Sequence, residues 1–259
     1  MQASSRTVFS GPALVRLLAR IASAEVHESG QSVFERLSEW LSWTDAIALS
    51  NALDGAPPAA ASRARAAGQS AAHDAQDAAC AEVRASLARA IADDRVFDMF
   101  GRGVSTPTPA FARAASRAPS VSTDAPIDFG VIRQHYVSMQ QHMEAKIAEL
   151  RDRLRRRLAT CSESSARLAA LDLTMDRAFG ERERSLFGAV PTVLEGHFKR
   201  LQRAEHDALS DPHALSDAAK PTPGAWLDVF RQDMQSALLA ELAIRFQPLE
   251  GLLAALRTR

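Results

Sequence analysis

Residues 129–161 read FGVIRQHYVSMQQHMEAKIAELRDRLRRRLATC, and this stretch decides the fold. Its apolar side chains recur at steps of three or four residues: Phe129, Ile132, Tyr136, Met139, Met143, Ile147, Leu150, Leu154, Leu158 and Cys161. Such spacing keeps all of them on one face of an α-helix. Neither proline nor glycine interrupts the chain between Gly130 and Gly180, so we expect a helix on the order of 50 Å long. Because a helix with one apolar stripe is not stable alone, other helices must cover that stripe.

Composition is that of a soluble helical protein. Of the 259 residues 46% are hydrophobic, and 31 basic residues balance 31 acidic ones. A neutral chain has no overall field that demands nucleic acid or an anionic membrane as partner. No run reaches the roughly 18 uncharged apolar residues that a membrane span needs, and no secretory signal is evident. The two cysteines, Cys80 and Cys161, lie on apolar helical stripes and cannot form a disulfide framework, which fits a cytoplasmic protein.

These patterns predict an all-α fold in which the long helix packs in an antiparallel helical bundle or coiled coil. The predicted segments are a small, compact N-terminal helical module (1–54), a linker (55–73), a helix (74–100), a disordered linker (101–126), a long helix or helical hairpin (127–208), a loop (209–223) and a C-terminal helix on the bundle (224–259). The linkers are rich in Ala, Ser, Pro and Gly and contain few large apolar residues.

Local signals mark several helix ends. Ser32 followed by Glu35 predicts a capping box, and Thr44 or Asp45 is expected to cap the next helix. Pro191 is expected to kink a helix or to start one, and Pro248 with Gly251 is expected to interrupt the last helix. The sequence leaves open whether the chain continues or turns back after Cys161.

No motif for chemistry is present. The chain lacks a GxSxG nucleophile turn, a phosphate-binding loop, a complete dinucleotide fingerprint and a CxxC pair. His135 and His142 lie two helical turns apart, about 10 Å, which is too far to share one metal ion. We therefore predict no catalytic residues, cofactor or metal, and hence not an enzyme. The alternative, an enzyme assembled from scattered polar residues, predicts a pocket where ionisable groups converge.

One local anomaly of charge is the arginine cluster at 151–157, which comprises Arg151, Arg153, Arg155, Arg156 and Arg157. These arginines surround much of the helix, and Glu149 and Asp152 are spaced to pair with Arg153 and Arg156. The favoured interpretation is a solvated collar. The alternatives are a site for an acidic protein, or a polyanion site for nucleic acid or lipid. The pairs Glu163–Arg167, Glu195–Lys199 and Glu241–Arg245 have the same acid-to-base spacing and are expected on solvated faces.

The resulting functional hypothesis is a non-enzymatic helical scaffold or adaptor that binds protein partners, including a second copy of itself. The predicted interface residues are Trp40, Trp43, Tyr136, Met139, Met143, Ile147, Leu150 and Leu154, since methionine and aromatic side chains are common at interfaces. The same stripe could instead be covered entirely within the chain. A second hypothesis is a nucleic-acid-associated regulator that uses the arginine cluster, although the neutral chain disfavours nucleic acid.

Three stretches carry a family resemblance: residues 14–18 (LVRLL) with 40–47 (WLSWTDAI), residues 181–186 (ERERSL) leading to Pro191, and residues 245–252 (RFQPLEGL). In these stretches the chain resembles a family of uncharacterised proteobacterial proteins that share a domain of unknown function. The resemblance implies genes that accompany inner-membrane proteins of the proton-channel motor kind and partners like outer-membrane protein A. It therefore implies a cytoplasmic accessory of a membrane-associated assembly, and it supplies no catalytic residues.

Overall fold

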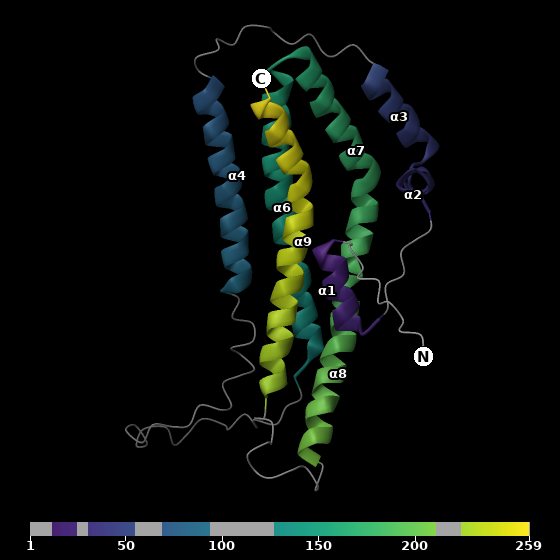
Figure 1. The fold of residues 1–259 in the computed structure, drawn as a ribbon, viewed down its shortest axis with the longest axis vertical. Coiled ribbons are helices and arrows are strands. Elements are labelled where there is room, and N and C mark those ends of the chain that lie inside the picture. Colours follow the sequence, from purple (N-terminus) through teal and green to yellow (C-terminus); the bar gives the residue numbers. More distant parts are fainter. Residues whose placement is uncertain (1–11, 25–30, 55–68, 94–126, 211–223, 259) are drawn as a thin grey trace, which may run out of the picture.

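The computed structural model describes residues 12–24, 31–54, 69–93, 127–210 and 224–258. Within these residues every regular element is an α-helix, which confirms the predicted all-α fold (Figure 1). Most of the predicted linker at 55–73, all of the linker at 101–126 and residues 211–223 of the predicted loop lie outside the described residues.

Helices α6 (Phe129–Ala159) and α7 (Glu163–Gly188) form an antiparallel hairpin at the centre of the fold. The Asp128 side chain caps α6 by accepting a hydrogen bond from the Gly130 N–H at 2.8 Å. At the turn, the Ser162 hydroxyl caps α7 by accepting from the Ser165 N–H at 3.4 Å. The chain therefore turns back after Cys161, which is the hairpin alternative of the sequence prediction.

Three further long helices pack around this hairpin (Figure 1). Helix α8 (Val190–Ser210) starts after a turn at Ala189, and Pro191 lies in its first turn, where a missing N–H costs nothing. Helix α9 (Ala225–Arg257) runs in the same direction as α6. Helix α4 (Gln69–Ala92) begins five residues before the predicted start and lies antiparallel to α9, with Arg84–Glu250 and Arg257–Asp77 ion pairs of 2.8 Å.

The expected interruption of the last helix is wrong, because α9 continues through Pro248 and Gly251. A proline inside a helix costs about 3 kcal/mol, since it removes one backbone donor and crowds the preceding turn. The helix persists because apolar side chains beyond the proline are buried, notably Leu249 and Leu252. Burying each such side chain contributes about 1.5–3 kcal/mol, so together they outweigh the cost.

The N-terminal helices are spread over the bundle and do not form one compact module. Helix α1 (Ala13–Ala22) packs against α8 and α9, whereas α3 (Trp43–Asp54), which follows α2 (Val33–Trp40), packs against α7 (Figure 1). Arg20 on α1 bonds to Asp233 of α9 at 2.9 Å, and His197 of α8 contacts the same carboxylate at 2.8 Å. The predicted capping box at Ser32 and Glu35 is confirmed.

The next cap differs from the prediction by a few residues. Ser42, rather than Thr44 or Asp45, caps α3: its hydroxyl accepts from the Asp45 N–H at 3.1 Å, and the Asp45 carboxylate accepts from the Ser42 N–H at 3.2 Å. The arrangement is a second capping box, with Asp45 in the third helical position. Asp45 would have been a suitable N-cap on its own, but Ser42 occupies the N-cap position, so Asp45 acts as its partner in the capping box.

The core is one continuous cluster that the long helices share with α1. At one end, the rings of Phe129, Phe198, Trp226 and Phe230 pack with centroids 4.9–6.3 Å apart. Cys80 is buried in this core and Cys161 packs against it, as expected for small apolar side chains. Over the described ranges, none of the helices has the length and apolar character that crossing a membrane requires.

Candidate functional site

The predicted interface stripe on α6 lies inside the chain. Tyr136, Met143, Ile147, Leu150 and Leu154 are buried, and Met139 is partly buried against the same core. Helices α4, α7, α8 and α9 cover this face of α6. The structure thus corresponds to the alternative in which the stripe is covered by the chain itself, and these six side chains present little surface to a partner.

The two tryptophans predicted at the interface lie elsewhere. Trp40, at the end of α2, is half-buried, and the Arg182 guanidinium lies over its ring at 5.4 Å from the centroid. Trp43, at the start of α3, is 80% exposed. Helix α3 has no buried residue, and besides Trp43 it exposes Ile47 and Leu53. Of the predicted interface residues, Trp43 therefore presents the largest apolar surface to a partner, and it lies on α3 rather than on α6.

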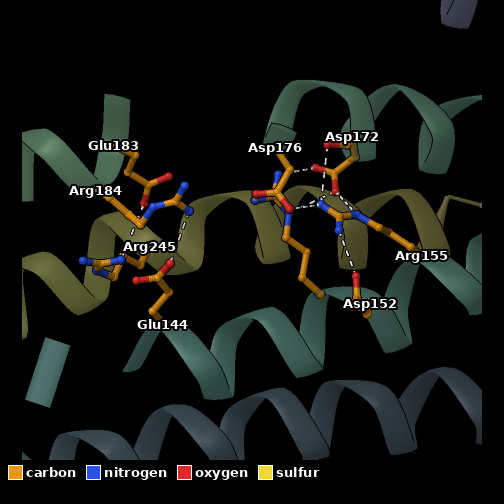
Figure 2. A network of polar contacts seen from close by, with 9 residues as sticks. Glu144, Asp152, Arg155, Asp172, Asp176, Glu183, Arg184 and Arg245 are labelled. Atoms are coloured by element: carbon orange, nitrogen blue, oxygen red, sulfur yellow. Dashed lines mark hydrogen bonds and ion pairs between the residues drawn. The ribbon is translucent and has the colours of Figure 1, made fainter. Parts of the chain in front are cut away.

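Two of the clustered arginines clamp the hairpin (Figure 2). Arg151 binds Asp172 through Nε at 3.0 Å and Nη2 at 2.7 Å, and it binds Asp176 at 2.7 Å. Arg155 donates from Nε to Asp172 at 2.6 Å and from Nη2 to Asp176 at 2.8 Å. Burial lowers the pKa of the Arg155 guanidinium, but its bonds to Asp176 and Asp172 outweigh burial and raise that pKa overall. These two arginines are hence internal ion-pair partners of α7 and not part of a solvated collar.

The remaining members of the arginine cluster at 151–157 stay nearer to solvent. Arg153 pairs with Glu149 at 3.2 Å, as the spacing predicts. The predicted Asp152–Arg156 pair is replaced, because Asp152 accepts from Arg155 at 2.9 Å. Arg156 is exposed and Arg157 is half-buried. A polyanion would therefore find Arg153 and Arg156 accessible, while Arg151 and Arg155 are already bound to aspartates.

A buried polar network joins α6 to α9. Glu241 is 0% exposed; its carboxylate accepts from the Tyr136 hydroxyl at 2.5 Å and from Gln140 Nε2 at 2.9 Å. Gln140 also donates to the Phe187 carbonyl at 3.0 Å, which ties in α7. Burial raises the pKa of the Glu241 carboxyl, and the hydrogen bonds from Tyr136 and Gln140 and the charge of Arg245 only partly offset that rise.

Arg245 lies beside this network with its donors poorly satisfied. Its side chain is 6% exposed, and its guanidinium lies over the Phe187 ring at 4.1 Å from the centroid. The nearest carboxylate oxygens, those of Glu241 and Glu183, are 3.8 and 3.9 Å away, beyond hydrogen-bonding distance. Arg245 Nε has no hydrogen-bond partner among the described residues. The sequence prediction of a solvated Glu241–Arg245 pair is wrong, whereas the Glu163–Arg167 and Glu195–Lys199 pairs do form near the surface.

A cavity of about 430 Å³ opens where Arg245 meets α6 and α7. We call it the charged cavity; its lining is Glu144, Ile147, Ala148 and Arg151 of α6, Asp176, Arg177, Gly180, Glu183 and Arg184 of α7, and Arg245 and Pro248 of α9. It reaches from the arginine clamp, formed by Arg151 and Arg155 with Asp172 and Asp176, to Arg245. Figure 2 draws both clusters. The space exists because the facing residues are small or short: Gly180 has no side chain, and Ala148 and Pro248 are compact.

The lining combines arginines and carboxylates with small apolar side chains. It contains no Ser, Thr, Cys, His, Lys or Tyr. Each acid faces an arginine: Asp176 is bonded to Arg151, Glu144 lies 3.5 Å from Arg184, and Glu183 lies 3.9 Å from Arg245. Ionisable groups do converge here, which is what the enzyme alternative predicts.

Sequence analysis missed this site because its members come from three helices. Two of the stretches that carry the family resemblance meet at the charged cavity, since 181–186 supplies Glu183 and Arg184, and 245–252 supplies Arg245 and Pro248. The first stretch reaches the same helix through the Trp40–Arg182 contact. No group of three His, Cys, Asp or Glu within the described residues could hold a metal ion.

Comparisons with known proteins give one match. A search of curated proteins and a search of solved structures each return no match. A family model covers residues 1–258, and its description is "Protein of unknown function (DUF3348)". The structure thus shows an all-helical fold for a domain whose function is unknown, and the chain belongs to the DUF3348 family.

Proposed function

We propose that the chain is a non-enzymatic helical scaffold or adaptor that binds a helix of another protein on α3. The observation that carries this proposal is the exposure of Trp43, which stands out at 80%. Tryptophan is enriched among the residues that dominate binding energy at protein interfaces. Ile47 follows it by one helical turn and therefore extends the same face.

The other face of α3 is already used. Helix α3 packs on α7, and its Leu49 and Ala52 side chains are half-buried. Trp43 and Ile47 point away from that side, because they lie about half a helical turn from those two residues. Leu53 adds apolar surface near the end of the helix, at 61% exposure. Helix α3 is thus apolar on two sides, and the intramolecular contact with α7 satisfies only one of them.

Charge indicates the kind of partner. Residues 33–54 contain four acids (Glu35, Glu39, Asp45 and Asp54) and one base (Arg36), a net charge of −3. A partner helix with an apolar stripe and flanking Lys or Arg would match both features, in the manner of a helix bound to an apolar surface. The family resemblance implies that this partner belongs to a membrane-associated assembly and that the chain acts from the cytoplasm.

A binding role rather than an enzymatic one is supported by the charged cavity. Its carboxylates face arginines, and its lining offers no nucleophile. The nucleic-acid hypothesis loses support, because Arg151 and Arg155 are engaged by Asp172 and Asp176.

The test uses a matched pair of surface variants. Trp43→Ser with Ile47→Ser removes the α3 face, and Val229→Ser with Leu239→Ser removes apolar side chains of 48% and 40% exposure from α9. Each tagged protein is cross-linked in the native host and purified, and the cross-linked peptides are mapped. We expect a basic helical segment of another protein to be linked next to α3 in the wild type and in the α9 variant but not in the α3 variant.

Two results would contradict the proposal. One is a set of partners that is unchanged by the Trp43 and Ile47 substitutions. The other is cross-links from α3 that reach only other residues of the same chain. Light scattering over a range of concentrations separates self-association, since a second copy on α3 would give a dimer that the α3 variant loses.

A further inference from the structure

We propose that the charged cavity binds a small molecule that joins one carboxylate to an apolar body. The proposal concerns the face between α6, α7 and α9, and it is independent of the α3 surface. It starts from Arg245, whose side chain is 6% exposed while its Nε has no hydrogen-bond partner among the described residues. Burying a polar donor without a partner is unfavourable, and more so when the donor belongs to a charged group.

Among the described residues, no group supplies the acceptor that Arg245 needs. The oxygens of Glu241 are committed to Tyr136 and Gln140 at 2.5–3.0 Å, and the nearest of them to Arg245 is 3.8 Å away. Glu183 stays at 3.9 Å. A guanidinium presents several N–H groups in one plane, and that plane matches the two oxygens of a carboxylate. A ligand carboxylate in the charged cavity could pair with the Nη1 and Nη2 groups of Arg245, which lie 3.9 and 3.8 Å from the nearest carboxylates of the described residues.

The charge of the lining sets the charge of the ligand. The lining contains four arginines (Arg151, Arg177, Arg184 and Arg245) and three acids (Glu144, Asp176 and Glu183), so four minus three leaves a net charge of +1. One negative charge balances this excess. A phosphate dianion would instead bring two charges close to Glu144 and Glu183, and its repulsion from them would exceed that of a monocarboxylate.

The rest of the lining sets the shape of the ligand. Ile147, Ala148 and Pro248 offer apolar surface from α6 and α9. Gly180 contributes open space from α7, where an added Cβ would meet only Arg184 Nη1, at 3.6 Å. The volume of about 430 Å³ lies in the range of ligand-binding pockets in proteins, about 300–1,000 Å³. The ligand is therefore an aliphatic or aromatic acid rather than a bare anion.

Calorimetric titration of the full-length protein tests the carboxylate. The probes are hexanoate and benzoate, each compared with its neutral amide, and inorganic phosphate. We expect at least one of the two acids to bind about tenfold or more tightly than its amide and than phosphate, because the amide cannot offer two anionic oxygens to the arginines. Equal binding of acid and amide, tighter binding of phosphate, or no binding of either acid overturns the proposal.

Variants locate the binding in the charged cavity. Gly180→Leu fills the space that Gly180 leaves and should abolish binding, whereas Gly180→Ala should retain it. Arg245→Gln and Arg184→Gln should each weaken binding by about tenfold, and Arg167→Gln on the solvent side of α7 should not. If Arg245→Gln fails to fold, Gly180→Leu and Arg184→Gln decide the outcome, since neither replaces a buried residue. Retained affinity in Gly180→Leu would place the ligand elsewhere and refute the assignment.

Discussion

Replacing Asp172 by asparagine tests whether the arginine clamp holds the α6–α7 hairpin together. Asp172 is 14% exposed and accepts three hydrogen bonds from guanidinium groups: two from Arg151 at 2.7 and 3.0 Å, and one from Arg155 at 2.6 Å. Asparagine keeps the shape of the side chain but removes its charge and turns an N–H₂ group toward the arginines. Both guanidiniums then lose their most buried counter-charge.

The stability lost in Asp172→Asn should be smaller than the cost of breaking a fully buried ion pair. Removing one partner of a fully buried ion pair costs about 3–5 kcal/mol, because the other charge is left uncompensated. Asp176 moderates this cost, since it also binds Arg151 at 2.7 Å and Arg155 at 2.8 Å and is 36% exposed. We therefore expect Asp172→Asn to lower the free energy of unfolding by about 2–3 kcal/mol, or the melting temperature by roughly 4–12 °C.

Glu149→Gln is the matched control for this experiment. It makes the same acid-to-amide change in a pair with Arg153, but both side chains are about half-exposed, at 60% and 47%. Pairs of this kind contribute about 0.5 kcal/mol or less. Urea unfolding of both variants with one common slope gives the comparison. If the two variants differ by less than about 0.5 kcal/mol, the clamp has no more effect than a solvated collar and the reasoning fails.

Three further predictions concern single residues. Burial raises the pKa of Glu241 above its ordinary value of 4.5, so the wild type should lose stability relative to Glu241→Gln as pH rises from that value through the raised pKa. Urea unfolding of both proteins at several pH values measures this, and a difference in unfolding free energy that does not change with pH contradicts it. Gly251→Ala should raise the free energy of unfolding by about 0.5–1 kcal/mol, because an added Cβ there meets open space and alanine favours the helix α9. Gly224→Ala should instead lower it by about 1 kcal/mol, because Gly224 has a φ of +86°. Iodoacetamide should alkylate Cys161 faster than Cys80, because Cys80 is buried and burial raises its thiol pKa; peptide mass spectrometry measures both, and faster labelling of Cys80 would be inconsistent with its burial.

The long helix and the all-α fold were predictable because their signal is local and repeated. Each apolar residue of the α6 stripe adds to one period, and the buried positions Ile132, Tyr136, Met143 and Leu150 follow it. Helix α9 was harder to predict in full. Pro248 and Gly251 oppose a helix locally, and only the burial of Leu249 and Leu252 in the tertiary structure overrides them.

The charged cavity could not be predicted in the same way. A spacing of four between Glu241 and Arg245 is the same on a solvated face and in a buried network, because the difference lies in what other helices bring to that face. Tyr136, Gln140 and Phe187 supply the contacts that make this pair internal. Composition also gave no warning, since the charged residues that line the cavity add almost nothing to the net charge of the chain.

One signal in the sequence does point to the clamp once the turn is known. Arg151 and Arg155 are four residues apart on α6, and Asp176 and Asp172 are four apart on α7, each pair facing the other across the hairpin. Gln140 and Phe187 lie eleven residues further from the turn on each helix and obey the same register. Counted along α6 from Arg151, the contacts of Arg155 and Gln140 with α7 therefore lie about one and three helical turns away.

This register explains why charges occupy an interface that apolar residues could fill. Suppose that α7 slipped by one turn so that Asp176 faced Arg155. Arg151 would then face Gly180, which has no side chain to accept a hydrogen bond. If it slipped the other way so that Asp172 faced Arg151, Arg155 would face Leu168. An interface of leucine and alanine alone would constrain the register less sharply, because the hydrophobic effect is not directional. In the observed register each arginine faces one aspartate of α7 and also reaches the other, whereas either slip places only one aspartate opposite the pair, so the clamp favours this alignment of the hairpin.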